Sequence, residues 1–366
     1  MRFRKYGGTD VPPGVRRRRF RRRVREREKR HIGRDGERRW QMARPKSQPD
    51  FVRILAPVHV SLLSAENRAT TLAFCRKIRE RLTISGNDLL LDFSRTNQLQ
   101  ATGMLAVMAE LDRSVRMTGG KRLIRCKLPS RHTEEGMIVG QVLDQIGMLE
   151  LIGQDPPIEH ANESFHESVR PWRYATGTRI DEKPGSVLEE HEGRISEAVM
   201  KGMQKGLAEA IVNSLHHAYA QPRRDGCGAF KERRWWMFTH ETNGMLSVIV
   251  CDLGIGIPRS LPLNWPRKLL SVIGEVIDGG SPDVTAIRTA LILGKSSTGN
   301  AHRGRGLPQV WEATQEAENS SVGIYSDRAY VSTAENGDPI NVNYRDRFLG
   351  TLVWWRVPIE AAVTDG

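Results

Sequence analysis

LSVIVCDLGIGIP, at residues 246–258, is the stretch that decides the fold of the C-terminal half. It opens as an almost continuous apolar run, which predicts a buried β-strand. The strand is predicted to break at Asp252, and Gly254 and Gly256 follow two residues apart. A carboxylate there can accept a hydrogen bond from an exocyclic amino group, and glycines let the backbone pass close to a flat ring. Alone, the pattern is also that of a strand followed by a glycine-rich turn.

A long helical pattern precedes this strand, at residues 187–220. Apolar residues recur every four positions from Leu207 and predict the helix face that contacts the core. Glu209, Asn213 and His217 recur with the same spacing on another face, so their side chains lie one above the other. Taken singly, such a stripe is more often a solvated helix surface than a site.

The third pattern is TGNAHRGRGL at residues 298–307, which leads into another helical stretch. Gly304 and Gly306 form a Gly-x-Gly at the start of that helix. Free backbone N–H groups and the positive end of the helix dipole suit phosphate oxygens there, and Arg303 and Arg305 add positive charge.

The order and spacing of these three patterns resemble the N-box, G1 and G2 motifs of the GHKL (Bergerat-fold) ATPases. A Glu-x3-Asn helix is followed by a strand ending in DxGxGIP, and then by GxGL at a helix start. The resemblance implies a two-layer α/β sandwich with a mixed sheet over residues 187–360. Segments typical of its closing antiparallel strands occur at 322–326, 329–333 and 350–358. No GxxxxGK[ST] motif is present, which excludes a P-loop NTPase.

The resemblance implies ATP and Mg²⁺ as cofactors. Asn213 would supply a side-chain oxygen to Mg²⁺, whose other ligands would be water and phosphate oxygens. Glu209 would be the general base toward a water molecule or an acceptor hydroxyl group. Asp252 would bind the amino group of adenine.

Other residues would complete the nucleotide site by the same resemblance. Residues 259–303 would form a lid over the nucleotide, and Ser281 would cap a helix within it. The remaining expected contacts with the base or the phosphates are Gly254, Gly256, Gly304, Gly306 and Lys295.

EAIVNSLHHAYA, at residues 209–220, is most similar to the N-box of the anti-sigma-factor serine kinases within that family. This implies a serine/threonine protein kinase or slow ATPase that acts on a STAS-like or sigma-like protein in a bacterial-type partner-switching pathway. A non-catalytic, ATP-gated interaction module is the alternative. His191 superficially matches the phosphoacceptor box of sensor histidine kinases, but we expect it to be a surface histidine, because that box normally sits on a separate dimerisation helix.

Residues 51–153 alternate between strand and helix patterns, which predicts an N-terminal α/β domain with crossover connections. The expected strands and helices lie, in chain order, at 52–57, 65–82, 88–94, 103–115, 121–129 and 134–153.

The turn LDFSRTNQLQATGML at residues 91–105 and this order of elements resemble a STAS domain. In that family the first serine of a D-S-S/T-G turn can be phosphorylated. Ala101 stands there and has no hydroxyl group, which excludes a phospho-switch at that position, and Thr102 has one a residue later. The resemblance therefore implies a docking or regulatory surface. An unrelated small α/β domain is the alternative.

Two segments are not expected to form domains. Residues 154–186 are rich in proline and glycine and are predicted to be a linker. Residues 1–50 hold 19 basic and 6 acidic side chains, which accounts for the whole net charge of +13 and predicts a disordered tail. Its Arg-rich run at 16–30 could bind nucleic acid, but we favour an inert tail or a translation start at Met42.

The remaining composition indicates a cytoplasmic protein. No apolar run reaches the ~20 residues that a membrane helix needs, so no membrane partner is expected. The four cysteines, widely spaced and without a CxxC pair, are expected to be reduced thiols. A homodimer remains open.

Overall fold

The computed structural model describes most of the chain. The described residues are 50–157, 160, 165–179, 188, 191, 193–277, 280–296, 306–312, 318–333 and 339–360. The Arg-rich run at 16–30 and the residues Arg303, Gly304 and Arg305 lie outside these ranges.

The N-terminal region is a small α/β layer, as the alternating pattern predicts. Its parallel sheet has the order β1-β3-β5, formed by Phe51–Leu55, Asp88–Asp92 and Ile124–Lys127. A second parallel pair joins β2 (His59–Val60) to β4 (Gln98–Leu99).

Helices α2 (Ala65–Arg79), with the π-helical turn η1 (Glu80–Ile84), and α3 (Ala101–Met117) connect these parallel strands. Two further helices, α4 (Glu134–Gln145) and α5 (Met148–Ile152), follow β5. The single helix expected at 134–153 is broken because Gly147 has a left-handed φ of 75°.

The C-terminal sheet has five strands in the order β6-β7-β8-β10-β9. The strands are Arg173–Gly177, Trp235–Thr242, Met245–Asp252, Pro339–Pro358 and Ser321–Thr333, in that order across the sheet. Every described pair in it is antiparallel, whereas we expected a mixed sheet. Hairpin connections explain the difference: β7 and β8 are joined by Asn243 and Gly244, both with positive φ, as a two-residue hairpin turn requires.

Strand β6 corrects the linker predicted at residues 154–186. Its five residues pair with β7 and form an edge of the sheet. The edge position explains why the strand has a weak sequence pattern, since all four of its residues before Gly177 are only half-buried.

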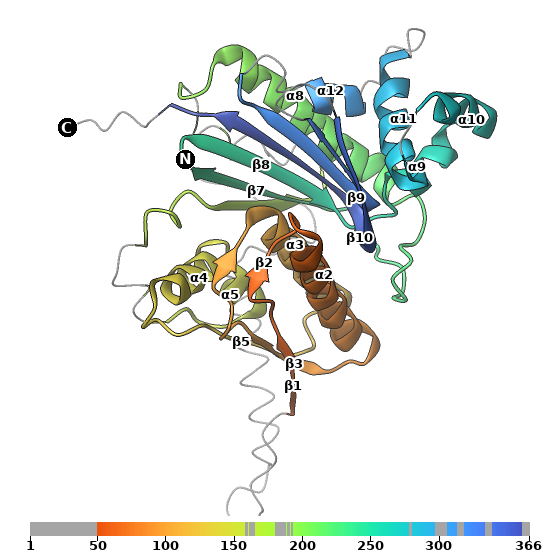
Figure 1. Cartoon of the computed structure of the whole chain (residues 1–366). Coiled ribbons are helices and arrows are strands. Elements are labelled where there is room, and N and C mark those ends of the chain that lie inside the picture. Colours follow the sequence, from red (N-terminus) through yellow and green to blue (C-terminus); the bar gives the residue numbers. More distant parts are fainter. Residues whose placement is uncertain are drawn as a thin grey trace, which may run out of the picture.

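Helices cover one face of this sheet (Figure 1). They are α8 (Glu197–Asn213) with the π-helical turn η2 (Ser214–Ala218), α9 (Ile257–Asn264), α10 (Arg267–Val276), α11 (Pro282–Ser296) and α12 (Gly306–Glu312). Helix α8 begins at Glu197, later than the pattern from 187 suggests, and is capped by Ser196, whose side chain accepts a hydrogen bond from Val199 N–H. The cap predicted at Ser281 is confirmed, since its Oγ accepts a hydrogen bond from Val284 N–H at 3.3 Å.

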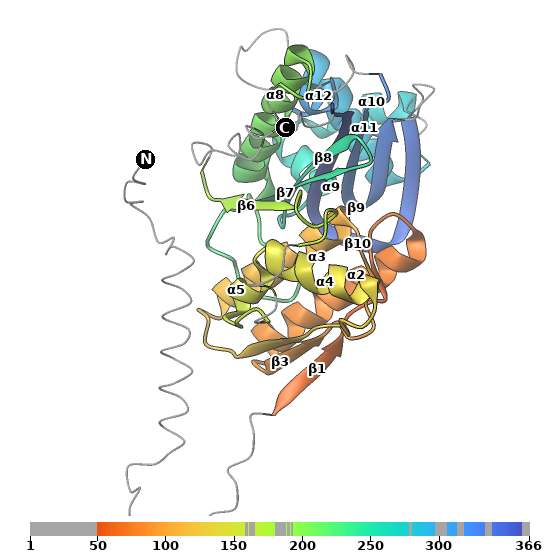
Figure 2. The same ribbon diagram turned by 90° about the vertical axis from the view of Figure 1, so that its left-hand side faces the viewer.

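The N-terminal region covers the opposite face of the five-stranded sheet. Figures 1 and 2 show α2 and α3 between that sheet and the parallel strands β1 and β3. All residues of α3 from Ala101 to Ser114 are buried. One apolar cluster therefore runs from the N-terminal region into the sheet, where it includes Trp236, Phe238 and Tyr325.

Buried charges on α3 tie the two regions together. Glu110 accepts hydrogen bonds from both terminal nitrogens of Arg223, at 3.2 and 2.7 Å. Arg113 pairs with Asp225 at 2.9 Å, and Asp112 accepts the indole N–H of Trp236 at 2.9 Å. The two regions are thus joined by directional bonds as well as by apolar contact.

A second tie lies at the end of the sheet near α2. The guanidinium group of Arg68 is fully buried and donates to the carbonyl of Asp327 at 3.1 Å. The same group lies over the ring of Tyr344, 4.5 Å from its centroid, which is a favourable cation–π arrangement.

Glu110→Gln should destabilise the protein by about 3–5 kcal/mol, because it leaves the buried guanidinium groups of Arg79, Arg113 and Arg223 with too little negative charge. Urea unfolding monitored by tryptophan fluorescence measures this. The exposed Glu150→Gln should stay within about 0.5 kcal/mol of the parent. Equal stability of the two variants would show that Glu110 does not hold the two regions together.

Candidate functional site

Asp252, the last residue of β8, lies where the strand ends next to β10. The residue is 4% exposed. One carboxylate oxygen, Oδ1, accepts the N–H groups of Gly254 at 2.8 Å and Thr351 at 3.2 Å. The other oxygen, Oδ2, accepts no backbone N–H group in the described structure.

Burial raises the pKa of Asp252 to about 7. The two backbone N–H groups, Arg223 and the hydroxyl group of Ser214 favour the ionised form, but they do not offset the loss of water. A ligand that donated a hydrogen bond to this carboxylate would favour ionisation.

The turn after Asp252 is fixed against the end of the α8–η2 helix. Gly254 has no room for a side chain, because a Cβ would overlap the carbonyl group of Ala218. The same carbonyl accepts Ile255 N–H at 2.8 Å, and the hydroxyl group of Tyr219 accepts Leu253 N–H at 3.3 Å. Two of the three patterns found in the sequence therefore meet in space.

Glycine is required at position 256 for a different reason, its backbone conformation. Its φ of 75° is left-handed, and helix α9 begins directly after it. Ser326 on β9 fixes this start, since its hydroxyl oxygen accepts Ile257 N–H at 2.8 Å and its O–H donates to the carbonyl of Gly350 at 3.1 Å.

The stripe of Glu209, Asn213 and His217 is half-buried, while the apolar face from Leu207 is buried, as expected. Burial raises the pKa of Glu209, and burial with the neighbouring His216 lowers the pKa of His217. The stripe thus carries a carboxylate that is more basic than usual and a neutral imidazole at neutral pH.

The third pattern is placed only in part. Gly306 is the first residue of α12, which packs along α8. Lys295 lies in the last turn of α11, but its side chain is outside the described structure, as is Gly304. The structure therefore leaves the phosphate contacts of these three residues as predictions.

His191 is not the surface histidine that we expected. It is 5% exposed, and its Nδ1 lies 4.0 Å from the carboxylate of Glu241 on β7. Arg194 makes a two-point ion pair with the same carboxylate, at 2.8 and 2.6 Å, and holds this segment against the sheet. Burial of the imidazole supports its exclusion as a phosphoacceptor.

Several residues of the site have no signal in the sequence. Ser214, Tyr219, Ser326 and Thr351 contact the turn only because distant segments meet there. Gly350 could have been noticed as a glycine within a strand pattern. A Cβ added at this position would overlap the carbonyl group of Asp252.

Within the described ranges, no group of three or more His, Cys, Asp or Glu side chains could hold a metal ion. A Mg²⁺ ion that keeps water and nucleotide phosphates as ligands needs few protein ligands. Glu209 and Asn213 are both half-buried and lie one turn apart at the end of α8, so their side-chain oxygens could face the same ion. The residues present therefore fit such an ion.

Comparison with protein-family models, curated proteins and solved structures gives no match. None of the helices in the described part is long and apolar enough to span a membrane. The four cysteines are free thiols, and three of them are buried.

Asp252→Asn should change how stability depends on pH. Between about pH 4 and pH 7 the folded parent retains a proton on Asp252 that the unfolded chain has lost, so this group makes the parent less stable as the pH rises. The asparagine variant lacks this penalty. Its stability relative to the parent should therefore increase by up to about 4 kcal/mol over that window, as measured by urea unfolding at several pH values. Parallel pH profiles would contradict the buried, protonated carboxyl.

Proposed function

We propose that the C-terminal region is an ATP- and Mg²⁺-binding domain of GHKL type, and that the N-terminal region is a STAS-like regulatory domain. The observation that carries the proposal is the junction of the β8 turn with the end of the α8–η2 helix. There the strand-end carboxylate of Asp252, the close approach of Gly254 to Ala218 and the nearby Asn213 combine two motifs that were separate in the sequence.

Asp252 is suited to recognising an adenine ring. Its Oδ1 is held by two backbone N–H groups, which leaves Oδ2 to accept the exocyclic amino group. A buried acceptor distinguishes adenine from bases that lack an amino group at this position, because such a base would leave the carboxylate without a hydrogen bond.

Glu209 and Asn213 would act on the phosphate side. When bound, ATP would supply the phosphoryl group and Mg²⁺ would neutralise part of its charge. Asn213 would ligate the cation through its side-chain oxygen. Glu209 would take the proton from an attacking hydroxyl group as its oxygen bonds to the γ-phosphorus and the bond to the β,γ-bridging oxygen breaks, which releases ADP. The raised pKa of Glu209 makes it a better base.

The acceptor would be a serine or threonine of a separate protein, as in partner-switching kinases, or water in a slow ATPase. The in-chain STAS-like region is a poor acceptor, because Ala101 lacks a hydroxyl group and Thr102 is 3% exposed. Its role would be regulation, through the buried contacts of α3 with the ATP-binding domain.

A nucleotide-gated switch without turnover is the second candidate. It is favoured by the ion pair between Glu110 and Arg223, because Arg223 lies five residues after η2 and could transmit a change at the site to α3. An anchor on nucleic acid through residues 16–30 has no such support.

Asp252→Asn should weaken ATP binding by about 1–3 kcal/mol, since asparagine can keep its oxygen toward the two backbone N–H groups but presents a second donor to the adenine amino group. Isothermal titration calorimetry with ATP and Mg²⁺ measures the loss. Asp144→Asn on α4 is the matched control and should bind ATP like the parent. Unchanged affinity of the Asp252 variant would refute the adenine site.

Glu209→Ala should bind ATP and Mg²⁺ nearly as well as the parent but lose about 10²–10⁴-fold in turnover, because a general base acts mainly in the transition state. Release of γ-labelled phosphate, or its transfer to a STAS-like partner, measures the rate. The exposed Glu197→Ala, at the other end of α8, should keep the parental rate. A parent that binds ATP but never turns it over would remove the kinase and leave the switch.

A further inference from the structure

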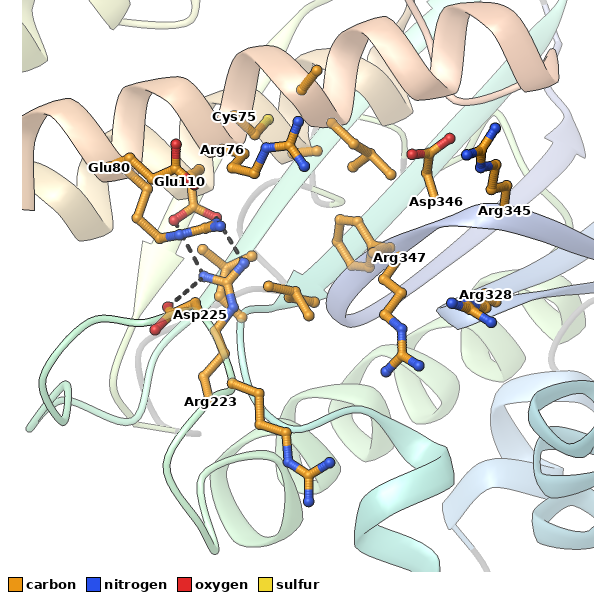
Figure 3. A pocket seen from close by; sticks show the side chains of 18 residues that line it. Cys75, Arg76, Glu80, Glu110, Arg223, Asp225, Arg328, Arg345, Asp346 and Arg347 are labelled. Atoms are coloured by element: carbon orange, nitrogen blue, oxygen red, sulfur yellow. Dashed lines mark hydrogen bonds and ion pairs between the residues drawn. The ribbon is translucent and has the colours of Figure 1, made fainter. Parts of the chain in front are cut away.

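A cavity of about 450 Å³ lies between the two regions, bounded by α2, the loop at 223–225 and the stretch of β10 at 345–349. Figure 3 shows its lining, with Arg76 on the helix side and Arg345 and Arg347 on the β10 side. None of the site residues predicted from the sequence lines it. Its lining therefore differs from that of the proposed ATP site, although Leu253 is the neighbour of Asp252.

The lining of this cavity is strongly basic. It contains seven arginines and four acidic residues, an excess of three positive charges. The arginines are Arg76, Arg79, Arg223, Arg224, Arg328, Arg345 and Arg347.

The floor is a buried charge network that does not balance. The carboxylates of Glu110 and Asp225 face the guanidinium groups of Arg79, Arg113 and Arg223, and all five side chains are at most 6% exposed. Burial opposes ionisation of Glu110, yet the arginines hold its pKa below its usual value. One positive charge remains uncompensated, and in the described structure the Nε atoms of Arg79 and Arg223 are buried without an acceptor.

The rim adds exposed arginines. Arg76, Arg224, Arg328 and Arg345 make no side-chain ion pair with any described residue. Arg347 forms an ion pair with Asp327, with 3.4 Å between Nε and Oδ1. The exposed guanidinium groups without an ion pair can therefore donate hydrogen bonds to a ligand in the cavity.

One side of the cavity is apolar. Leu72 and Ala106 from the N-terminal region contribute to it, as do Leu253 and Phe348, which are each 2% exposed. A volume of this size with an apolar wall and several convergent charged groups is typical of sites for small organic ligands. Planar guanidinium groups bind phosphate oxygens in pairs, which favours a phosphorylated ligand.

We propose that this cavity is a binding site for a small molecule that carries two or more phosphate groups next to an apolar portion. The phosphates contact the rim arginines, and the apolar portion packs on Leu253 and Phe348. Because α2 and the loop at 223–225 both line the cavity, the ligand strengthens the contact between the two regions and acts as a regulator. The proposal does not depend on ATP binding elsewhere.

The test is calorimetric titration of the full chain with inorganic pyrophosphate, without Mg²⁺, at physiological salt. The parent should bind with a Kd below about 1 mM, and the exposed double variant Arg76→Gln/Arg224→Gln should bind at least about tenfold more weakly. Arg356→Gln is the matched control, since Arg356 is an exposed arginine on β10 that does not line the cavity. It should bind like the parent.

Pyrophosphate should also raise the melting temperature of the parent and of Arg356→Gln, but not that of the double variant. Equal binding by the double variant and the parent would overturn the site, because the anion would then lie elsewhere, including at the proposed ATP site. Absence of binding by the parent would overturn it as well.

A second arm tests the apolar wall. Thymidine diphosphate has no exocyclic amino group on its base to donate to Asp252, so it probes the cavity with little contribution from the adenine site. It should bind more tightly than pyrophosphate, and the double variant should lose both ligands. Binding no tighter than that of pyrophosphate would overturn the apolar part of the proposal.

Discussion

The burial of helix α3 between two sheets is the constraint on which the rest of the structure depends. Fourteen consecutive residues of this helix, from Ala101 to Ser114, are buried, including charged ones. Buried charges are tolerated only when partners compensate for the lost water. The C-terminal region supplies those partners through Arg223, Asp225 and Trp236. Each region alone would therefore expose apolar surface and leave charged groups without their partners.

This arrangement connects the proposed nucleotide site with the N-terminal region. Asp252 ends the strand that packs on α3, and Arg223 both favours ionisation of Asp252 and pairs with Glu110. A ligand that changes the charge at Asp252 therefore acts on the same guanidinium group that joins the two regions. The basic cavity lies on the same network, because Arg223 and Glu110 line it. Two proposed ligands would thus be coupled through one ion pair.

Much of the local structure was predictable, because strong apolar periodicity identifies elements that are buried along their length. The strand ending at Asp252 and the helix face from Leu207 are cases of this kind, whereas the cap at Ser281 was predictable from its local capping residues. Strand β6 was predicted as linker because an edge strand carries little periodicity. His191 was predicted to be exposed because its burial depends on β7, nearly 50 residues away in the chain.

The sequence by itself determined the class of elements, the positions of Glu209, Asn213 and Asp252 on them, and the need for glycine after the strand. These features depend on neighbours within a few residues, where spacing and residue type carry the physical signal. Only the tertiary structure decided that the C-terminal sheet is antiparallel, that α3 fills its second face and that seven arginines meet around one cavity. Those outcomes depend on contacts between residues far apart in the chain, and such contacts leave no periodic trace in a single sequence.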